Sequence, residues 1–155
     1  MNLITEPINE TNFKTFGRVV ILPQKDPTSQ AADYKFWSDI ANYKIEGETE
    51  IGLCTVYKQN EDSISGMERH LNTPEILIPV DSPFILPLLI EGDYVDQAKA
   101  YVVKPGEAVV IDPGVWHGAC LPVGAERATY FVIFRRKTPF EDVEKKEIEK
   151  ITISQ

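Results

Sequence analysis

Between residues 33 and 136, short apolar runs alternate with turn-forming residues. This pattern limits the folds that the chain can adopt. Turns are signalled by Asp81-Ser82-Pro83 and Lys104-Pro105-Gly106, among others. The runs between the turns are rich in Val, Ile, Tyr and Phe, which favour strands. Short strands at close spacing indicate an all-β barrel or sandwich. The predicted strands are 33–41, 49–58, 66–70, 75–80, 84–90, 98–103, 107–111 and 127–136.

The two ends of the chain are expected to add short segments to this barrel. Residues 8–16 predict a short amphipathic helix whose apolar members are Ile8, Phe13 and Phe16. The mixed charges of residues 140–150 are typical of a solvated C-terminal helix or turn. We expect that charged run to take no part in catalysis.

The sequence predicts a single domain. It has 155 residues and no linker, so residues 1–155 are predicted to form one unit with its barrel core at about 33–136. Residues 24–32 are polar and rich in turn formers, and we expect a mobile loop there.

The composition of the chain indicates which classes of binding partner it is expected to lack and in which cellular compartment it is expected to lie. A formal net charge of −8 argues against nucleic-acid binding, which needs a basic surface. The longest apolar run, 84–90, is too short to cross a membrane, and the N-terminus lacks the features of a signal peptide, so a cytoplasmic location is expected. Cys54 and Cys120 have no CxxC pairing and are expected to be buried, reduced thiols, with a disulfide or a metal role as the alternative.

The only two histidines, His70 and His117, each stand in a pattern that could form half of one site. Glu68 lies two residues before His70, so both side chains can point to the same face of a strand. Glu75 follows His70 by five residues, and His117 ends a stretch that passes through the Pro113-Gly114 turn. Two imidazoles and two carboxylates would offer mixed ligands that suit a divalent metal.

These two stretches resemble the two sequence motifs of the cupin superfamily, small β-barrels of the jelly-roll type. In the first motif Glu68 stands where cupins usually have a histidine, and the second keeps the span from Gly106 to His117. Within the cupins the chain resembles the ureidoglycolate lyase family over roughly residues 13–136. That similarity is carried by Phe16-Gly17-Arg18-Val19-Val20, Glu68-Arg69-His70, Ile78-Pro79 and Gly114-Val115-Trp116-His117.

The chain also departs from the family pattern. Family members usually have a Tyr-His pair where this chain has Ile111-Asp112, and often have Gln at the position of Glu75. An arginine on an earlier strand has only Lys58 as a candidate match.

The resemblance implies a metal-dependent lyase that releases urea from ureidoglycolate to give glyoxylate, a step of allantoin degradation and purine catabolism. It implies a homodimer and a small carboxylic acid substrate. The divalent ion would be Ni, Mn, Fe or Zn, bound by Glu68, His70, Glu75 and His117. The predicted catalytic residues are Glu68, Glu75 and His117, with Glu68 or Glu75 as the base that takes the substrate's hydroxyl proton.

Aromatic and basic side chains are expected to form the walls of the substrate pocket. Substrate-binding candidates are Lys58, Tyr57, Tyr101 and Trp116, with Tyr130 as a further wall residue. Arg135 and Arg136 could hold a substrate carboxylate or form surface salt bridges. Structural alternatives stay open, because His117 could be a core histidine and Glu68 could face solvent.

Two other functions fit the same residues. One keeps the metal cluster but isomerises or opens a sugar acid, and the Asp112 substitution motivates it. The other is a non-enzymatic small-molecule-binding cupin, which the scarcity of histidines motivates.

Overall fold

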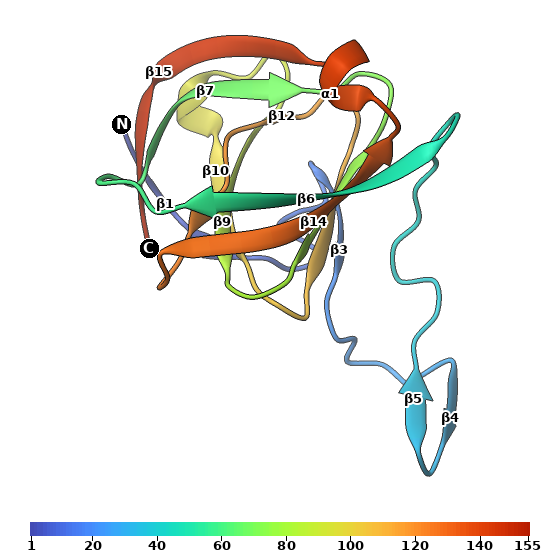
Figure 1. Cartoon of the computed structure of the whole chain (residues 1–155). Helices are drawn as coiled ribbons and strands as arrows, with labels where there is room; N and C mark the ends of the chain where they lie inside the picture. The colour runs from blue at the N-terminus through green and yellow to red at the C-terminus, as the bar shows by residue number, and fades with distance from the viewer.

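Two sheets face each other in the computed structural model, which describes all 155 residues, and they wrap into a barrel (Figure 1). The five-stranded sheet runs in the order β3 (Gly17–Val20), β11 (Ala108–Ile111), β8 (Glu75–Pro79), β14 (Arg127–Arg135) and β6 (Thr49–Tyr57). The eight-stranded sheet runs in the order β1 (Asn2–Ile4), β15 (Glu144–Ser154), β7 (Ser63–Arg69), β12 (Trp116–His117), β9 (Phe84–Leu89), β10 (Lys99–Val103) and β2 (Glu6–Pro7), and β13 (Leu121–Pro122) pairs with β9. The predicted all-β barrel is confirmed.

Seven of the eight predicted strands form in the barrel, each within three residues of its expected bounds. Their apolar runs are bounded by residues that stop a ladder, such as Pro83 before β9 and Gly106 before β11. The seven are β6, β7, β8, β9, β10, β11 and β14.

The core occupies both faces of the central strand β9. Leu86 and Leu88 belong to a cluster of sixteen buried side chains inside the barrel. Ile85 and Leu89 belong to a second cluster of ten on the other face. Because successive strand residues point to opposite faces, a strand buried on both sides needs an unbroken apolar run, which β9 has.

Residues 8–16 form turns and not the predicted helix. The side chain of Asn9 accepts hydrogen bonds from the backbone N–H groups of Thr11 and Asn12, at 2.9 and 2.7 Å. Such local side-chain bonds compete with helical ones and hold the segment as a turn. The apolar residues of the segment are nevertheless buried in the core, as their spacing suggested.

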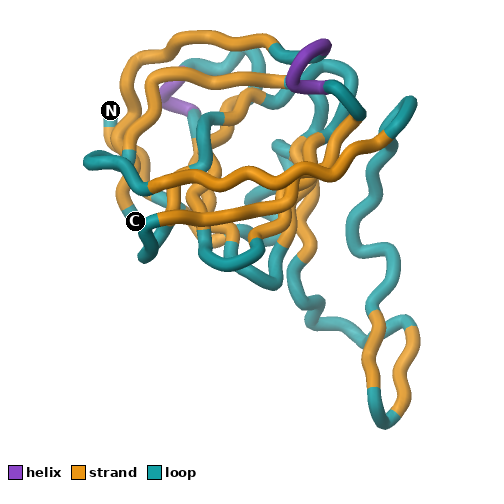
Figure 2. The backbone as a smooth tube through the Cα atoms, viewed as in Figure 1, coloured by secondary structure: helices purple, strands orange, loops and turns teal.

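Residues 24–41 do not contribute to the barrel. The predicted loop contains β4 (Ser29–Ala31), and the predicted strand 33–41 is reduced to β5 (Tyr34–Phe36). These two strands pair only with each other, in a hairpin that stands away from the barrel (Figure 1). Long coil segments join it to β3 and β6 (Figure 2).

The C-terminal region, predicted as a helix or turn, is mostly the strand β15, which pairs with β7 and β1. Its charges are compatible with a strand because only Ile151 and Ile153 need to be buried, and they alternate with polar residues. The helical part is limited to α1 (Thr138–Glu141), and a 3₁₀ turn covers Val95–Gln97. No helix in the structure has the length and apolar character needed to span a membrane.

Candidate metal centre

Three of the four predicted ligands meet inside the barrel. Glu75 is the first residue of β8, His117 belongs to β12, and His70 directly follows β7. The Oε2 atom of Glu75 lies 3.0 Å from Nε2 of His117 and 3.3 Å from Nε2 of His70. One donor atom from each residue lies within 4.8 Å of the others, and all three residues are buried.

The contact between Glu75 and His117 is close but is not a hydrogen bond. Glu75 Oε2 and His117 Nε2 are buried and lack a partner in hydrogen-bonding geometry. Buried polar atoms are almost always paired, so two such atoms side by side call for a third group between them. Two imidazoles and a carboxylate are suitable ligands for a divalent transition metal, and the set leaves coordination positions free for substrate. The residues therefore fit a metal ion.

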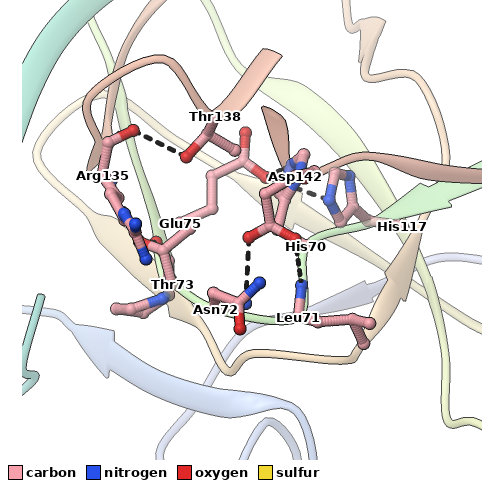
Figure 3. A network of polar contacts seen from close by, with 10 residues as sticks. His70, Leu71, Asn72, Thr73, Glu75, His117, Arg135, Thr138 and Asp142 are labelled. Carbon is pink, nitrogen blue, oxygen red and sulfur yellow. Dashed lines mark hydrogen bonds and ion pairs between the residues drawn. The ribbon is translucent and has the colours of Figure 1, made fainter. Parts of the chain in front are cut away.

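The ring of His70 is oriented by the C-terminal part of the chain (Figure 3). Its Nδ1 lies 2.8 Å from the backbone carbonyl oxygen of Asp142, to which it donates. The Asp142 carboxylate in turn accepts bonds from the backbone N–H groups of Leu71 and Asn72, at 3.0 and 2.9 Å. A metal-binding histidine commonly has such a partner, which fixes its tautomer and leaves Nε2 free.

The position of His117 is set by the turn before it and by the strands beside it. Gly114 has a φ of +83°, a conformation that glycine adopts without strain. Its backbone N–H donates to the carbonyl oxygen of His70 at 2.7 Å and ties the two sequence motifs together. His117 then pairs with Glu68 of β7 and Leu88 of β9.

The electrostatics of the group favour an ionised carboxylate. Burial raises the pKa of Glu75, but the close imidazoles of His117 and His70 outweigh it and lower the pKa to about 2. Burial lowers the pKa of His70, but the adjacent charge of the Glu75 carboxylate reverses this, so the net shift of the pKa is upward. Glu75 is thus a weak base that carries full negative charge at neutral pH.

The three ligands lie where two cavities meet. The larger cavity, of about 760 Å³, is lined by His70 and Glu75, and the smaller one, of about 470 Å³, by His117. Glu68 and Lys145 line both. The larger volume falls within the range of small-molecule binding sites.

Glu68 is not part of the ligand group, in contrast to the prediction. It lines the cavities, half-buried, but its carboxylate is not among the donor atoms that converge. β7 ends at Arg69, and His70 is the first residue after it; Glu68 and His70 both line the larger cavity, as their two-residue spacing suggested. In the backbone register of the sheet, Glu68 lies beside Lys145 of β15.

Two predicted substrate-binding aromatics point away from the cavity. Tyr101 is buried in the core, where its hydroxyl donates to the carbonyl oxygen of Asn12 at 2.7 Å. Trp116 precedes His117 on a strand and therefore faces the other side. There its ring lies between Arg69 and Lys146, 4.5 and 4.4 Å from the ring centroid.

Of the remaining predicted wall residues, two lie away from the cavities and one lines the larger cavity. Tyr57 is 61% exposed on the outer face of β6, because the inward positions of that strand are the even-numbered ones. Lys58 follows β6 and forms an ion pair with Asp62 at 3.5 Å. Tyr130 does line the larger cavity, as do Cys54 and Phe134.

Arg135, Arg136 and Asp112 line neither of the two cavities described above. Arg136 forms an ion pair with Glu48 at 3.9 Å, and Arg135 lines a small depression beside α1. Asp112 pairs with Arg18 at 3.8 Å, and it lines a separate small pocket together with His70, Glu75 and His117. Burial raises the pKa of the Asp112 carboxyl.

Lys145 is the residue that sequence reasoning missed. It belongs to the charged run from which no role was expected, yet it lines both cavities opposite Glu68. The alternation of Ile151, Thr152, Ile153 and Ser154 was the available signal, because it indicates that the tail is a strand.

Comparison with known proteins supports the resemblance. A family model described as "Ureidoglycolate lyase" matches residues 1–154. A ureidoglycolate lyase of Chelativorans sp. is 26% identical over 133 residues, which cover 81% of this chain and 80% of that protein. One of Rhodobacter capsulatus is 26% identical over 129 residues, covering 79% and 80%.

Among solved structures, Peruvianin-I, described as a cysteine peptidase from Thevetia peruviana latex, has a TM-score of 0.50 at 16% identity, over 65% of this chain and 57% of that one. At this identity the likeness concerns the fold alone.

Proposed function

The chain belongs to the ureidoglycolate lyase family, and from this premise we propose that it cleaves ureidoglycolate to glyoxylate and urea in the cavities around His70, Glu75 and His117. The observation that carries the proposal is the pair of orphaned donor atoms on Glu75 and His117, beside a carboxylate and an ammonium group that face the same space.

His70, Glu75 and His117 would hold a divalent metal ion, and Mn, Fe, Ni and Zn are all compatible with this donor set. When bound, the ion would supply positive charge that lowers the pKa of the substrate hydroxyl. The chain's own residues then have three tasks: to orient the substrate, to accept the hydroxyl proton and to return a proton to the leaving nitrogen.

Glu68 is the better candidate for the base. Glu75 is a weak base at a pKa of about 2 and is enclosed by both histidines. Glu68 lines both cavities without belonging to the ligand group. Its carboxylate would accept the hydroxyl proton while the C–O bond becomes a carbonyl and the C–N bond breaks. The protonated side chain would then give that proton to the urea nitrogen.

Lys145 is the candidate anchor for the substrate carboxylate. It is a cation on the cavity wall, and its pairing position on β15 is opposite Glu68. A carboxylate held by Lys145 would present its α-carbon hydroxyl toward Glu68, which fits a substrate whose hydroxyl and carboxylate are on neighbouring carbons.

The proposal is tested by incubating the purified, metal-loaded protein with ureidoglycolate and measuring glyoxylate and urea. We expect both products in equal amounts, and expect Glu68→Gln to reduce kcat by about 10²- to 10⁴-fold, the usual contribution of a general base. Glu126→Gln is the matched control, since Glu126 is exposed and lines neither cavity. Absence of turnover in the wild-type protein would refute the function; full turnover in Glu68→Gln would refute the role of Glu68 alone.

Replacing Lys145 by methionine removes the charge and keeps the length of the side chain. We expect KM for ureidoglycolate to rise about 10- to 100-fold, because a hydrogen bond to a charged group contributes about 1.5–3 kcal/mol. Steady-state kinetics measure the change, and Lys99→Met, on an exposed lysine of β10, is the control. An unchanged KM would show that the carboxylate is held elsewhere.

The two alternative functions lose their motivation. Asp112, which suggested a sugar-acid isomerase, forms an ion pair with Arg18 and borders the ligands only in a small pocket that has no room for a substrate. The scarcity of histidines suggested a binding protein, but both histidines converge on one buried carboxylate.

A further inference from the structure

The residue before each histidine of the candidate centre lines neither cavity. Arg69 ends β7 directly before His70, and Trp116 directly precedes His117 in β12. Because successive residues of a strand point to opposite faces, the Trp116 ring is directed away from the His117 imidazole. On that side the guanidinium carbon of Arg69 lies over the Trp116 ring, 4.5 Å from its centroid. Each of the two sequence motifs therefore supplies one partner of this contact.

Two carboxylates fix the Arg69 side chain in this position. Nη1 donates to Oε2 of Glu91 at 2.6 Å, and Nε and Nη2 donate to Oε2 of Glu144 at 2.8 and 2.7 Å. The indole N–H of Trp116 donates to the same Glu91 oxygen. Because a guanidinium is planar and its donors point in fixed directions, bonds to two carboxylates set its plane. We call Arg69, Glu91, Trp116 and Glu144 the Arg69 clamp.

The clamp joins the strands that carry or orient the two histidines. These strands are neighbours in the order β15, β7, β12 and β9 (Figure 1). Glu91 follows the end of β9 by two residues. Glu144 begins β15, two residues after Asp142, whose carbonyl oxygen accepts from the His70 ring. The clamp thus connects the segment that orients His70 to the strand that carries His117.

β12 is the strand that most needs such a support, because it has only two residues. Its register with β7 consists of the single pair His117 and Glu68, and its register with β9 has two pairs. So short a ladder offers few backbone hydrogen bonds to hold a strand in place. Trp116 is 5% exposed and Arg69 has an 18% exposed side chain, so the contact between them is largely shielded from water. A cation on an aromatic face is held more strongly when it is shielded in this way.

We propose that Arg69 is a positioning residue, which acts through the clamp to hold the imidazoles of His70 and His117 at the separation that a shared metal ion requires. For the metal ion this inference rests on the proposed function. The separation itself does not, since the two ring centroids lie 5.2 Å apart in the protein alone. Residues that orient metal ligands from behind typically affect metal affinity or activity about 10- to 100-fold.

Titration with Co²⁺ tests the role of Arg69 in the metal centre. Arg69→Met removes the guanidinium and keeps an unbranched side chain, and we expect the dissociation constant for Co²⁺ to rise about 10- to 100-fold. The visible spectrum of the bound Co²⁺ is expected to change, because the ligands are no longer aligned. In kinetics with ureidoglycolate, kcat should fall with little change in KM, since the clamp does not line the cavities. A folded Arg69→Met protein with the wild-type affinity and spectrum overturns the proposal.

Lys150→Met is the matched control, because it breaks an ion pair with Glu61 on the same strand β15 without touching the clamp. Its Co²⁺ affinity and spectrum should equal those of the wild type, and equal losses in both variants would contradict a specific role of Arg69. Circular dichroism verifies folding. Glu91→Ala is the second variant if Arg69→Met does not fold, since the Glu91 side chain is 60% exposed and its removal leaves no buried cavity. It is expected to weaken Co²⁺ binding in the same direction, and unchanged binding overturns the proposal.

A double-mutant cycle tests whether the clamp acts as one unit. Residues of one network give coupled effects, so the loss of Co²⁺ affinity in the double variant, Arg69→Met with Glu91→Ala, should be smaller than the sum of the two single losses. Additive losses would show two independent supports and would contradict the clamp.

Nuclear magnetic resonance gives a readout that needs no metal. The chain has only two histidines, so histidine-labelled protein shows the two rings alone. We expect a nuclear Overhauser effect between the rings in the wild type and in Lys150→Met, and a weakened one in Arg69→Met. An effect of equal strength in Arg69→Met, or none in the wild type, overturns the positioning role. A wild type that shows this effect but binds no metal would instead contradict the proposed function.

Discussion

Replacing His117 by alanine is expected to abolish metal binding and to reduce kcat/KM for ureidoglycolate by at least about 100-fold. The substitution removes one of three nitrogen and oxygen donors that converge within 4.8 Å. Glu75 then keeps only His70 as a neighbour, and a two-donor site binds a divalent ion weakly. Since a bound metal supplies several kcal/mol of transition-state stabilisation, its loss corresponds to a rate reduction of this size or larger.

The measurement combines metal content by elemental analysis with the rate of glyoxylate release. His70→Ala is expected to behave in the same way, because its Nε2 faces the same carboxylate oxygen. The Glu126→Gln protein should retain both the metal and the activity. If His117→Ala kept the metal and the rate, the centre would be a structural histidine pair and the metal assignment would be wrong.

Replacing Gly17 by alanine is expected to destabilise the fold by about 3 kcal/mol or more, because the new methyl group has no room. A Cβ built there would lie 1.8 Å from the carbonyl oxygen of Val110, a backbone atom that cannot rotate away. Gly17 begins β3 and pairs with Ile111 of β11, so relief of the clash would separate the two strands. For a chain of this length the melting temperature should fall by about 10 °C.

Gly66→Ala is the matched control for this clash. Gly66 also lies in a strand, but the nearest backbone atom to its added Cβ is the Lys146 oxygen at 3.5 Å, an ordinary contact. Thermal unfolding followed by circular dichroism compares the two variants. A Gly17→Ala protein as stable as Gly66→Ala would mean that β3 can shift away from β11 at little cost.

The part of the site that could be predicted is the part set by local pattern. The spacing of His70, Glu75 and His117 follows from motif positions on strands whose apolar runs are clear in the sequence. The places of Tyr101 and Trp116 depended on which side of a strand faces the interior, and β9 and its neighbours are buried on both sides. On such a strand both faces are apolar, so an aromatic side chain can be buried on either one. The composition of the strand therefore does not tell toward which face the side chain points.

Of the segments that were predicted incorrectly, the C-terminal one owes its structure to long-range pairing. β15 gains its strand conformation from β7, about 80 positions earlier in the chain, and its charged half carries little local strand preference. Residues 25–46 contain strand-forming aromatic residues, but nothing in the composition of this segment indicates that it stands outside the barrel. In β15 distant contacts overrule the local preference, whereas the β4–β5 hairpin forms from a local pairing that the sequence pattern did not reveal.

The contact between His70 and Asp142 joins residues 72 positions apart, and it has a consequence for the order of events in folding. All three donors precede residue 118, but the group that sets the His70 tautomer arrives only when the C-terminal strand has docked. A chain that has folded only as far as β14 contains His70, Glu75 and His117, but the ring of His70 lacks the Asp142 carbonyl that orients it. Uptake of a metal ion by the proposed site would thereby require the segment around Asp142 to be in place.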